Sequence, residues 1–340
     1  MTLAEIQGLF GESVRIEAFR RFGADPGRFE ELEGSAPVYR CAADGREIAL
    51  KIVPGYAPGH GQVTGSTVEQ VGGEMDFVLA LAEAGVPVAA PVPSASGAYV
   101  EVVEAGREDA AFLASATEFL PGELLPDDDV MRFPEGLVPA WGRAVGMLHR
   151  VSEGFAPSPG RRRLSWLDSD LLDEAWFEGG DGRLARERGR LLEAAALPSG
   201  PQSYGLCHGD PHHGNFMWHE GRLTLFDFDA ARYAPYADDL QAALYNCLPM
   251  PREDVEGRRR FALDFIEDFA EGYRAERPLP REELKRLPLL LKLGELTSYA
   301  HYRKYWVGRE LTPRRREIIA GYERRLAEGV PVVAFREGDL

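Results

Sequence analysis

The sequence has few cysteines, no long apolar run and no excess of positive charge. Its three cysteines, Cys41, Cys207 and Cys247, show no spacing typical of disulfides or of a zinc site. No apolar stretch approaches the roughly 20 residues that span a bilayer. The N-terminal residues lack the basic start and continuous apolar core of a signal peptide. We therefore expect a cytoplasmic protein whose cysteines stay reduced.

Positive charge is scarce, because 39 Lys and Arg residues stand against 55 Asp and Glu, for a formal net charge of −16. A strongly acidic chain repels phosphate backbones and anionic lipids, which argues against nucleic acids and membranes as partners. The 340 residues, 44% of them hydrophobic, are enough to bury one large or two medium cores. Nothing in the sequence indicates an oligomeric state.

The most informative segment runs from residue 208 to 229. It begins with His-Gly-Asp at 208–210, continues to Asn215 and ends in Asp227-Phe-Asp. Two short apolar runs separated by Glu220-Gly221 lie between Asn215 and Asp227, a pattern typical of a β-hairpin. Paired residue numbers should sum to 441 or 442, and the second register would place Asn215 directly opposite Asp227.

Carboxylate and amide oxygens at that spacing suit Mg²⁺, whose ligand distances are about 2.1 Å. Asp210 would then lie beside the metal, where a base for an incoming hydroxyl belongs. Such a set indicates phosphoryl transfer, which needs a placed base, metal ligands and a positive charge on the phosphates. Each residue alone could instead be a turn former. A metal hydrolase is a further alternative, although its candidate ligands lack the helical spacing of zinc motifs; these are His208, His212, His213 and His219.

The segment resembles the catalytic segment of the aminoglycoside phosphotransferase and choline kinase superfamily, which has the protein-kinase-like fold. The resemblance rests on His208-Gly209-Asp210, Asn215 and Asp227 in this order and spacing. It implies that Asp210 is the catalytic base, with His208 in the same catalytic loop. It also implies that Asn215 and Asp227 hold Mg²⁺, that Asp239 supports the loop from the next helix, and that ATP is the phosphate donor.

Lys51 is the candidate for the positive charge on the ATP phosphates. It lies in the apolar run 47–53, which resembles the kinase strand that carries the phosphate-binding lysine. The alternative is an edge-strand lysine that blocks aggregation. Glu74 is the predicted partner of Lys51, with Glu69 left open. Gly72-Gly73 would weaken a helix at this point, so the helix could begin only at Glu74.

The remaining nucleotide contacts are assigned by position and resemblance. No G-x-G-x-x-G precedes Lys51, so the phosphate-covering loop is placed at residues 33–37, with Ser35 as its predicted contact. Backbone groups of Glu118 and Leu120, in the strand-to-hinge segment, are predicted to bind adenine. His149 is expected to be structural, packed beneath the catalytic loop.

The pattern predicts an α+β protein with two lobes and the protein-kinase-like fold. Residues 1–118 form a small nucleotide-binding lobe with a five-stranded antiparallel sheet, and residues 119–340 form a larger, mainly helical lobe that binds the acceptor. Predicted strands cover 29–33, 38–41, 47–53, 98–103 and 111–119. Predicted helices cover 67–85, 135–151, 183–196, 238–247, 253–275, 281–307 and 312–327, after one or two within 1–23.

The sequence says least about the phosphate acceptor. Only residues 228–238 separate Asp227 from Asp239, which is short for a segment that docks a peptide. We therefore predict transfer to the hydroxyl of a small molecule such as an aminoglycoside, an amino-alcohol or homoserine. The Asp227-Phe-Asp229 segment also resembles a bacterial branch with stress-response kinase A and homoserine-kinase-like proteins, which leaves a protein Ser/Thr kinase as an alternative. Asp229 replaces the glycine of Asp-Phe-Gly, as a second metal ligand or a support of the loop.

A nucleotide-binding scaffold without catalysis is the second alternative. The four catalytic positions, Lys51, Asp210, Asn215 and Asp227, are all filled. This favours an active enzyme over a scaffold.

Overall fold

A computed structural model describes residues 8–33, 36–55, 67–107, 110–125, 132–178, 182–195, 202–248, 254–306 and 311–340. The chain divides into two compact units. The first contains residues 1–121 and 155–163, and the second contains residues 122–154 and 164–340. Among the described residues, no helix combines the length and the apolar character needed to cross a membrane.

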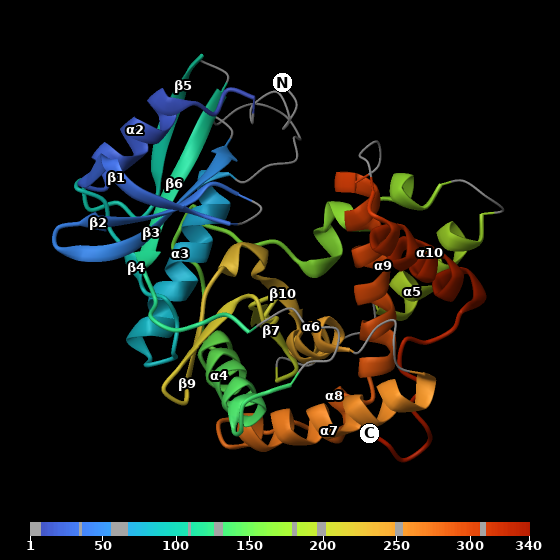
Figure 1. Cartoon of the computed structure of the whole chain (residues 1–340). Coiled ribbons are helices and arrows are strands. Elements are labelled where there is room, and N and C mark those ends of the chain that lie inside the picture. Colours follow the sequence, from blue (N-terminus) through green and yellow to red (C-terminus); the bar gives the residue numbers. More distant parts are fainter. Residues whose placement is uncertain are drawn as a thin grey trace. The chain divides into compact units, whose positions relative to one another are not determined.

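The first unit is built on an antiparallel sheet of six strands in the order β1-β2-β3-β6-β4, with β5 also paired to β6 (Figure 1). The strands are β1 (Ala24–Leu32), β2 (Val38–Ala43), β3 (Arg46–Gly55), β4 (Pro91–Val92), β5 (Glu101–Arg107) and β6 (Ala110–Glu118). The prediction of five strands is therefore wrong by one. The missed strand, β4, has two residues, which is too short to show an alternating pattern.

Helix α2 (Glu12–Arg21) covers one face of this sheet. Ala18 and Phe19 of the helix share a core with Leu50 and Ile52 of β3, and all four side chains are fully buried. Successive side chains of a strand point to opposite faces. Lys51, between Leu50 and Ile52, therefore points away from this core.

Helix α3 (Val68–Glu83) is continuous, so the possibility that it begins only at Glu74 is wrong. Thr67 caps its first turn in a reciprocal capping box. A Cβ added to Gly73 would lie 2.5 Å from the carbonyl oxygen of Arg162. The glycine therefore serves the close packing of segment 155–163 on the helix, and this packing offsets its weak helix propensity.

The second unit is mainly helical (Figure 1). Its α-helices are α4 (Leu137–Ser152), α5 (Arg183–Ala195), α6 (Ala237–Cys247), α7 (Val255–Arg274), α8 (Arg281–Leu284), α9 (Leu287–Trp306) and α10 (Pro313–Glu328). The helix predicted over 281–307 is divided into α8 and α9. Three short 3₁₀-helices follow α4 that the sequence pattern did not predict: η1 (Trp166–Asp168), η2 (Asp170–Leu172) and η3 (Glu174–Phe177).

Two small antiparallel sheets carry the segment that resembles a catalytic segment. Strand β7 (Tyr204–Cys207) pairs with β10 (Arg232–Pro235), and β8 (Phe216–His219) pairs with β9 (Arg222–Leu225). The 3₁₀-helix η4 (Phe228–Ala230) lies between β9 and β10. Residues 208–215 thus form a loop that leaves one sheet and enters the other.

Helices α4 and α7 cross in close contact beneath these sheets. A Cβ on Gly142 of α4 would lie 1.9 Å from the carbonyl oxygen of Phe269 in α7. A Cβ on Gly272 of α7 would lie 1.7 Å from the carbonyl oxygen of Pro139 in α4. Two glycines, one on each helix, therefore permit a backbone approach that any larger residue would prevent.

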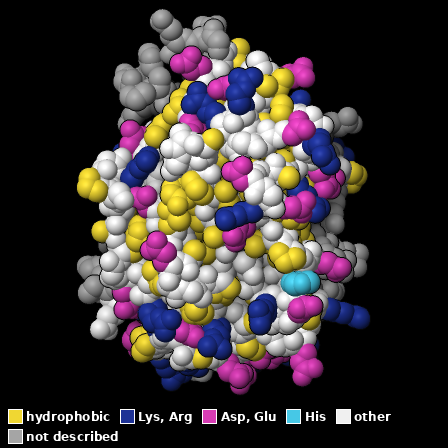
Figure 2. All heavy atoms as spheres, turned by 90° about the vertical axis from the view of Figure 1, so that its left-hand side faces the viewer, with side chains coloured by type: hydrophobic (Ala, Val, Ile, Leu, Met, Phe, Trp, Pro, Cys, Tyr) yellow, Lys and Arg dark blue, Asp and Glu magenta, His cyan; other side chains and the backbone are white. Residues whose placement is uncertain are grey.

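One face of the surface is drawn in Figure 2. On this face acidic and basic side chains are interspersed among hydrophobic ones. The formal net charge of −16 is therefore not gathered there into a patch of one sign.

Candidate active site

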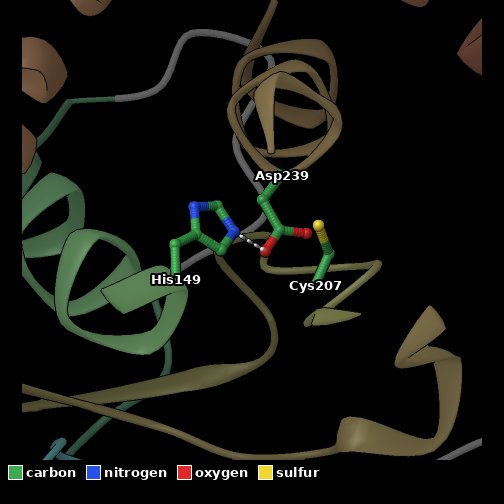
Figure 3. A group of neighbouring side chains, drawn as sticks. All are labelled: His149, Cys207 and Asp239. Atoms are coloured by element: carbon green, nitrogen blue, oxygen red, sulfur yellow. Dashed lines mark hydrogen bonds and ion pairs between the residues drawn. The ribbon is translucent and has the colours of Figure 1, made fainter. Parts of the chain in front are cut away.

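Asp239, in the first turn of α6, holds the loop that follows β7. Its Oδ2 accepts a hydrogen bond from the His208 amide at 2.9 Å, and its Oδ1 accepts one from the Gly209 amide at 2.8 Å. His149 of α4 lies with Nε2 at 3.0 Å from Oδ2 (Figure 3). Burial opposes ionisation of this carboxyl, but hydrogen bonds from His149 and Gly209 hold the pKa of Asp239 below its usual value. Asp239 thus supports the loop as the resemblance implied, and the buried His149 contacts Asp239 as a structural residue.

Gly209 is at the point where the loop passes closest to the chain after β9. Its φ is 86°, in the left-handed region that favours glycine. A Cβ at this position would lie 2.1 Å from the carbonyl oxygen of Ala230. Both the backbone conformation and the available space therefore require glycine between His208 and Asp210.

His208 is fully buried and joins the loop to the end of β9. Its Nε2 donates to the carbonyl oxygen of Phe226 at 3.1 Å, and its Nδ1 accepts from the Asp210 amide at 3.4 Å. The ring packs against that of Phe228, with centroids 4.2 Å apart and the planes tilted by 33°. These contacts position Asp210, while a direct part for His208 in the chemistry stays a prediction.

Asp210 presents a carboxylate that is 44% exposed, with Oδ2 at 3.5 Å from His212 Nε2. The side-chain nitrogen of Asn215 donates to the Asp210 carbonyl oxygen at 2.9 Å. The backbone amide of Asn215 donates to the His212 carbonyl oxygen at 2.9 Å. Because the amide nitrogen of Asn215 is directed at the loop, its side-chain oxygen is the atom suited to a metal ion.

The hairpin between Asn215 and Asp227 is present, but in the other of the two registers. Its paired residue numbers sum to 441, and Asn215 lies opposite Phe226, whose amide donates to the Asn215 carbonyl oxygen at 2.9 Å. The prediction that Asn215 lies opposite Asp227 is therefore wrong. Asp227 has φ 62°, and this left-handed conformation ends the extended pairing one residue earlier. Glu220 and Gly221 form the turn. Both have positive φ, as a two-residue hairpin turn of type I′ requires.

Arg232 and Asp238 form an ion pair at 2.9 Å beside the loop. Burial raises the pKa of Asp238, the positive charge of Arg232 opposes that rise, and the carboxylate of Asp210 adds to it. The sequence pattern did not single out this ion pair. Its proximity in sequence to Asp239 was the available signal.

His149, Cys207 and Asp239 bring three metal-binding atom types within 4.8 Å of one another (Figure 3). The chemistry argues against a metal ion here. Both oxygens of Asp239 already accept hydrogen bonds, and burial raises the pKa of the Cys207 thiol well above its usual value. A protonated thiol, 3.6 Å from the carbonyl oxygen of Ala234, is a poor metal ligand. The group is a hydrogen-bonded support, and a zinc hydrolase gains no support from it.

In the first unit, Lys51 lies on a central strand. It pairs with Val38 of β2 on one side and Ser115 of β6 on the other, so the edge-strand alternative is wrong. Glu74 of α3 is buried, and Arg163 approaches it with Nη1 at 3.7 Å from Oε2. Arg163 was not predicted, because it follows Glu74 by a long stretch of sequence. The pairing of Lys51 with Glu74 stays a prediction.

The alternative partner, Glu69, lies in the first turn of α3. Its pKa is lowered mainly by a hydrogen bond with the Thr67 side chain, followed by its own backbone amide. These local contacts belong to the start of the helix. Thr67 and Gln70 form the capping box, and Glu69 is the acidic residue of the same first turn.

The predicted adenine contacts lie at the end of β6. The Glu118 amide donates to the carbonyl oxygen of Ala90 at 2.9 Å, and Leu120 follows the last strand residue. Adenine binding by these two residues stays a prediction. Ser35 lies outside the described residues. In the second unit, the backbones of Glu123 and Trp218 exchange hydrogen bonds of 3.3 and 3.1 Å, which ties the chain after residue 121 to β8.

One side of α9 lies within electrostatic reach of Asp210. Desolvation and the charge of Lys304 lower the pKa of His301, and the carboxylate of Asp210 opposes this effect. The rings of His301 and Tyr305 lie 4.7 Å apart between centroids. Lys304 forms an ion pair with Asp170 of η2. The sequence pattern did not predict this group, because its members come from distant segments.

Comparisons with known proteins agree over most of the chain. A model of the "phosphotransferase enzyme family" matches residues 29–279. Amicoumacin kinase of Bacillus subtilis (strain 168) is 29% identical over 328 residues, which is 95% of this chain and 94% of the relative. A solved amicoumacin kinase in complex with AMP-PNP, Ca²⁺ and Ami superposes with a TM-score of 0.86 and 26% identity, covering 98% of both chains.

A microcompartment-associated aminopropanol kinase shares the fold, with a TM-score of 0.70 and 21% identity over 93% of this chain and 95% of that one. The expected superfamily and the α+β protein-kinase-like fold are thus confirmed, apart from the number of strands.

Proposed function

The chain belongs to the phosphotransferase enzyme family, and from this premise we propose that it transfers the γ-phosphate of ATP to a hydroxyl of a small molecule. The observation that carries the proposal is the loop 208–215. Asp239 holds its first two amides, Asn215 holds the Asp210 carbonyl, and the Asp210 carboxylate is left partly exposed. Such a rigid support with one exposed carboxylate suits a base for an incoming hydroxyl.

The residues of this chain would act mainly by positioning and by charge. Asp210 would accept a hydrogen bond from the acceptor hydroxyl, orient it and take its proton. Lys51 would bind the α- and β-phosphates of ATP. Glu74, the proposed partner of Lys51, would share its negative charge between Lys51 and Arg163. Transfer of a phosphoryl group requires little more than this placement and the neutralisation of developing charge.

The residues proposed for the metal fit Mg²⁺. Asp227 would supply a carboxylate oxygen. Asn215 would supply its side-chain amide oxygen, since its side-chain NH₂ group already donates a hydrogen bond to the Asp210 carbonyl oxygen. Hard oxygen ligands of this kind match Mg²⁺. When bound, the ion would neutralise charge on the phosphates.

We place the acceptor among small-molecule alcohols. Two relatives that match at least 95% of this chain are named amicoumacin kinases, so amicoumacin is the first acceptor to test. The face of α9 that carries His301 is the proposed acceptor side, because it interacts with Asp210. A cytoplasmic location, where ATP is present and thiols stay reduced, belongs to the same proposal; all three cysteines are buried and free.

The acceptor is identified by measuring Mg²⁺-dependent ADP release with amicoumacin, amino-alcohols, aminoglycosides, homoserine and a generic protein substrate. Release stimulated by one small molecule, with phosphate recovered on that molecule, supports the proposal. Phosphate recovered on mixed proteins would instead indicate a protein Ser/Thr kinase. A lack of stabilisation by ATP or GTP with Mg²⁺ would contradict nucleotide binding altogether.

Replacing Asp210 with Asn tests the proposed base. Turnover should fall by about 10²–10⁴, because placed acid–base groups usually contribute that much. The increase in Tm on adding ATP and Mg²⁺ should change little, because Asp210 is not among the proposed phosphate or metal contacts. Asp268→Asn, at an exposed position of α7, is the matched control and should keep full turnover. Survival of turnover within about tenfold in Asp210→Asn would contradict the assignment.

A further inference from the structure

A chain of hydrogen bonds runs from Arg277 to the catalytic loop through three other side chains. Arg277 Nη1 donates to Tyr273 Oη, and Tyr273 Oη lies 2.9 Å from His149 Nδ1. His149 Nε2 lies 3.0 Å from Asp239 Oδ2 (Figure 3). All four side chains are at most 7% exposed. Water therefore does not compete for these bonds, and each partner depends on the next.

The direction of each bond follows from the chemistry of the end groups. An ionised carboxylate only accepts, so His149 must donate from Nε2 to Asp239. A neutral imidazole then has an unprotonated Nδ1, which must accept from the Tyr273 hydroxyl. A guanidinium only donates, so Arg277 takes the free lone pair of the Tyr273 oxygen. One arrangement of protons therefore gives every hydrogen bond in this chain one donor and one acceptor.

The elements that carry these groups are held closely together. A Cβ on Gly146 of α4 would lie 2.9 Å from the carbonyl oxygen of Tyr273 in α7, so the two helices meet directly below His149. Arg277 also donates to Glu153 at 2.7 Å and to the carbonyl oxygen of Gln202 at 2.6 Å. Its guanidinium lies 4.4 Å from the centroid of the Tyr236 ring. Arg277 is thus fixed on several sides and directs one donor at Tyr273.

We infer that Tyr273 and Arg277 are positioning residues for phosphoryl transfer, which act on the catalytic loop through His149 and Asp239. Tyr273 keeps His149 neutral with its proton on Nε2. His149 in that form supports the carboxylate that holds the amides of His208 and Gly209. The catalytic consequence rests on the proposed function, whereas the protonation of His149 does not.

Burial supports the neutral form of His149. It lowers the pKa of the imidazole, and the hydrogen bond and charge of Asp239 oppose this effect. The titratable and charged groups around the ring are Asp239, Tyr273, Arg277, Glu153, Cys207, Tyr236 and His208. Removing the Tyr273 hydroxyl would leave Nδ1 without a donor, which makes its protonation easier.

Tyr273→Phe tests the inference by removing one hydroxyl while the ring remains. We expect kcat to fall about fivefold to tenfold, the factor for one lost hydrogen bond, with KM for ATP and for the acceptor unchanged. Tyr322→Phe is the matched control, because Tyr322 is also buried and lies outside the chain of bonds. It should lower stability to a similar degree and leave kcat unchanged.

A second readout does not depend on any acceptor. The ¹⁵N chemical shifts of His149 should report a neutral ring protonated at Nε2 in the wild-type protein from pH 8 to pH 5. In Tyr273→Phe the ring should take up a second proton within that range. Unchanged His149 shifts in Tyr273→Phe, or equal losses of kcat in Tyr273→Phe and Tyr322→Phe, would overturn the inference. If no acceptor is found, the His149 shifts still decide it, so its failure is distinct from failure of the proposed function.

Discussion

At the scale of single residues, Gly209 carries two separate requirements. Its φ of 86° is unfavourable for any residue with a Cβ, and its neighbour Ala230 leaves no room for one. Gly221, in the hairpin turn, has a similar φ of 75° but nothing within 4 Å of an added Cβ. The two glycines therefore separate the cost of the backbone conformation from the cost of the close approach.

Gly209→Ala should lower the free energy of unfolding by more than Gly221→Ala. A strained φ alone costs about 1–3 kcal/mol, and Gly209→Ala adds a clash with the Ala230 carbonyl. It should also reduce turnover, because the clash displaces the residue next to Asp210. Urea unfolding and steady-state kinetics of the two variants measure both effects. If the two variants lost equal stability and kept equal turnover, the prediction would be contradicted, because the loop would then accommodate a Cβ at residue 209 without a further cost.

The sequence indicated the candidate residues of this site, but not the partners that they contact. Asp210, Asn215 and Asp227 were recognised because they follow one another at fixed spacing. Tyr273 and Arg163 were missed because each meets its partner only after the chain has folded back over a long stretch. A motif shows residues that are near in sequence, whereas a buried hydrogen bond joins residues that are near in space.

At the scale of elements, α9 contributes the side proposed for the acceptor. The charge of Asp210 acts to raise the pKa of His301, and Tyr305 and Lys304 lie within one turn of His301 on the same helix. Lys304 is paired with Asp170, which connects α9 to η2. The helix thus brings an imidazole, an aromatic ring and an ion pair to one place.

His301→Ala should raise KM for the acceptor by about threefold to tenfold and leave KM for ATP unchanged, because a contact on the acceptor side is lost. His219→Ala, at the exposed end of the hairpin, is the matched control and should change neither value. Steady-state kinetics with each substrate varied in turn measure the effect. An increase in KM for ATP alone would contradict the assignment of His301 to acceptor binding.

The long helices were predicted close to their observed ends, because their apolar periodicity extends over several turns. Short elements were missed, among them β4, β7, β10 and the 3₁₀-helices, because two to four residues contain no period. The hairpin was predicted but its register was not. The left-handed conformation of Asp227, which sets where pairing stops, leaves no mark in an apolar pattern.

At the scale of the whole molecule, stability should depend on pH through Glu283. This residue of α8 is 4% exposed, and neither of its carboxylate oxygens has a hydrogen-bond partner among the described residues. Burial raises its pKa to about 7, while the charges of Arg277 and Arg286 oppose the rise and Glu153 adds to it. The folded protein therefore keeps a proton that the unfolded chain has already lost.

The free energy of unfolding should fall as pH rises from about 4.5 to about 7, since the folded state binds more protons in that window. Below this window the contribution is fully present, and above it the contribution is lost. Glu283→Gln should remove a pH dependence on the order of 3 kcal/mol, at about 1.4 kcal/mol per pKa unit. Glu282→Gln, on the same short helix with a side chain 79% exposed, should behave as wild type. Urea unfolding at several pH values measures the slope, and a slope unchanged in Glu283→Gln would contradict the prediction.

The α+β protein-kinase-like fold was predictable, because the segment 208–229 resembles the catalytic segment of a superfamily that has this fold. The net charge of the chain was less informative about binding partners, because acidic and basic side chains are mixed on the face shown in Figure 2. The identity of the acceptor was not predictable, because its proposed surroundings come from distant segments whose proximity exists only in the folded chain.

The hairpin of β8 and β9 also determines where the chain can tolerate a change of length. Glu220 and Gly221 are exposed, and open space surrounds Gly221, so two residues added at this turn would extend the hairpin without altering its ladder. One residue inserted within a strand would turn the side chains beyond it to the opposite face. It would thereby disturb the placement of Asn215 relative to Asp227, the two proposed ligands of Mg²⁺. Natural insertions and deletions between these two residues should therefore occur at the turn and in even numbers.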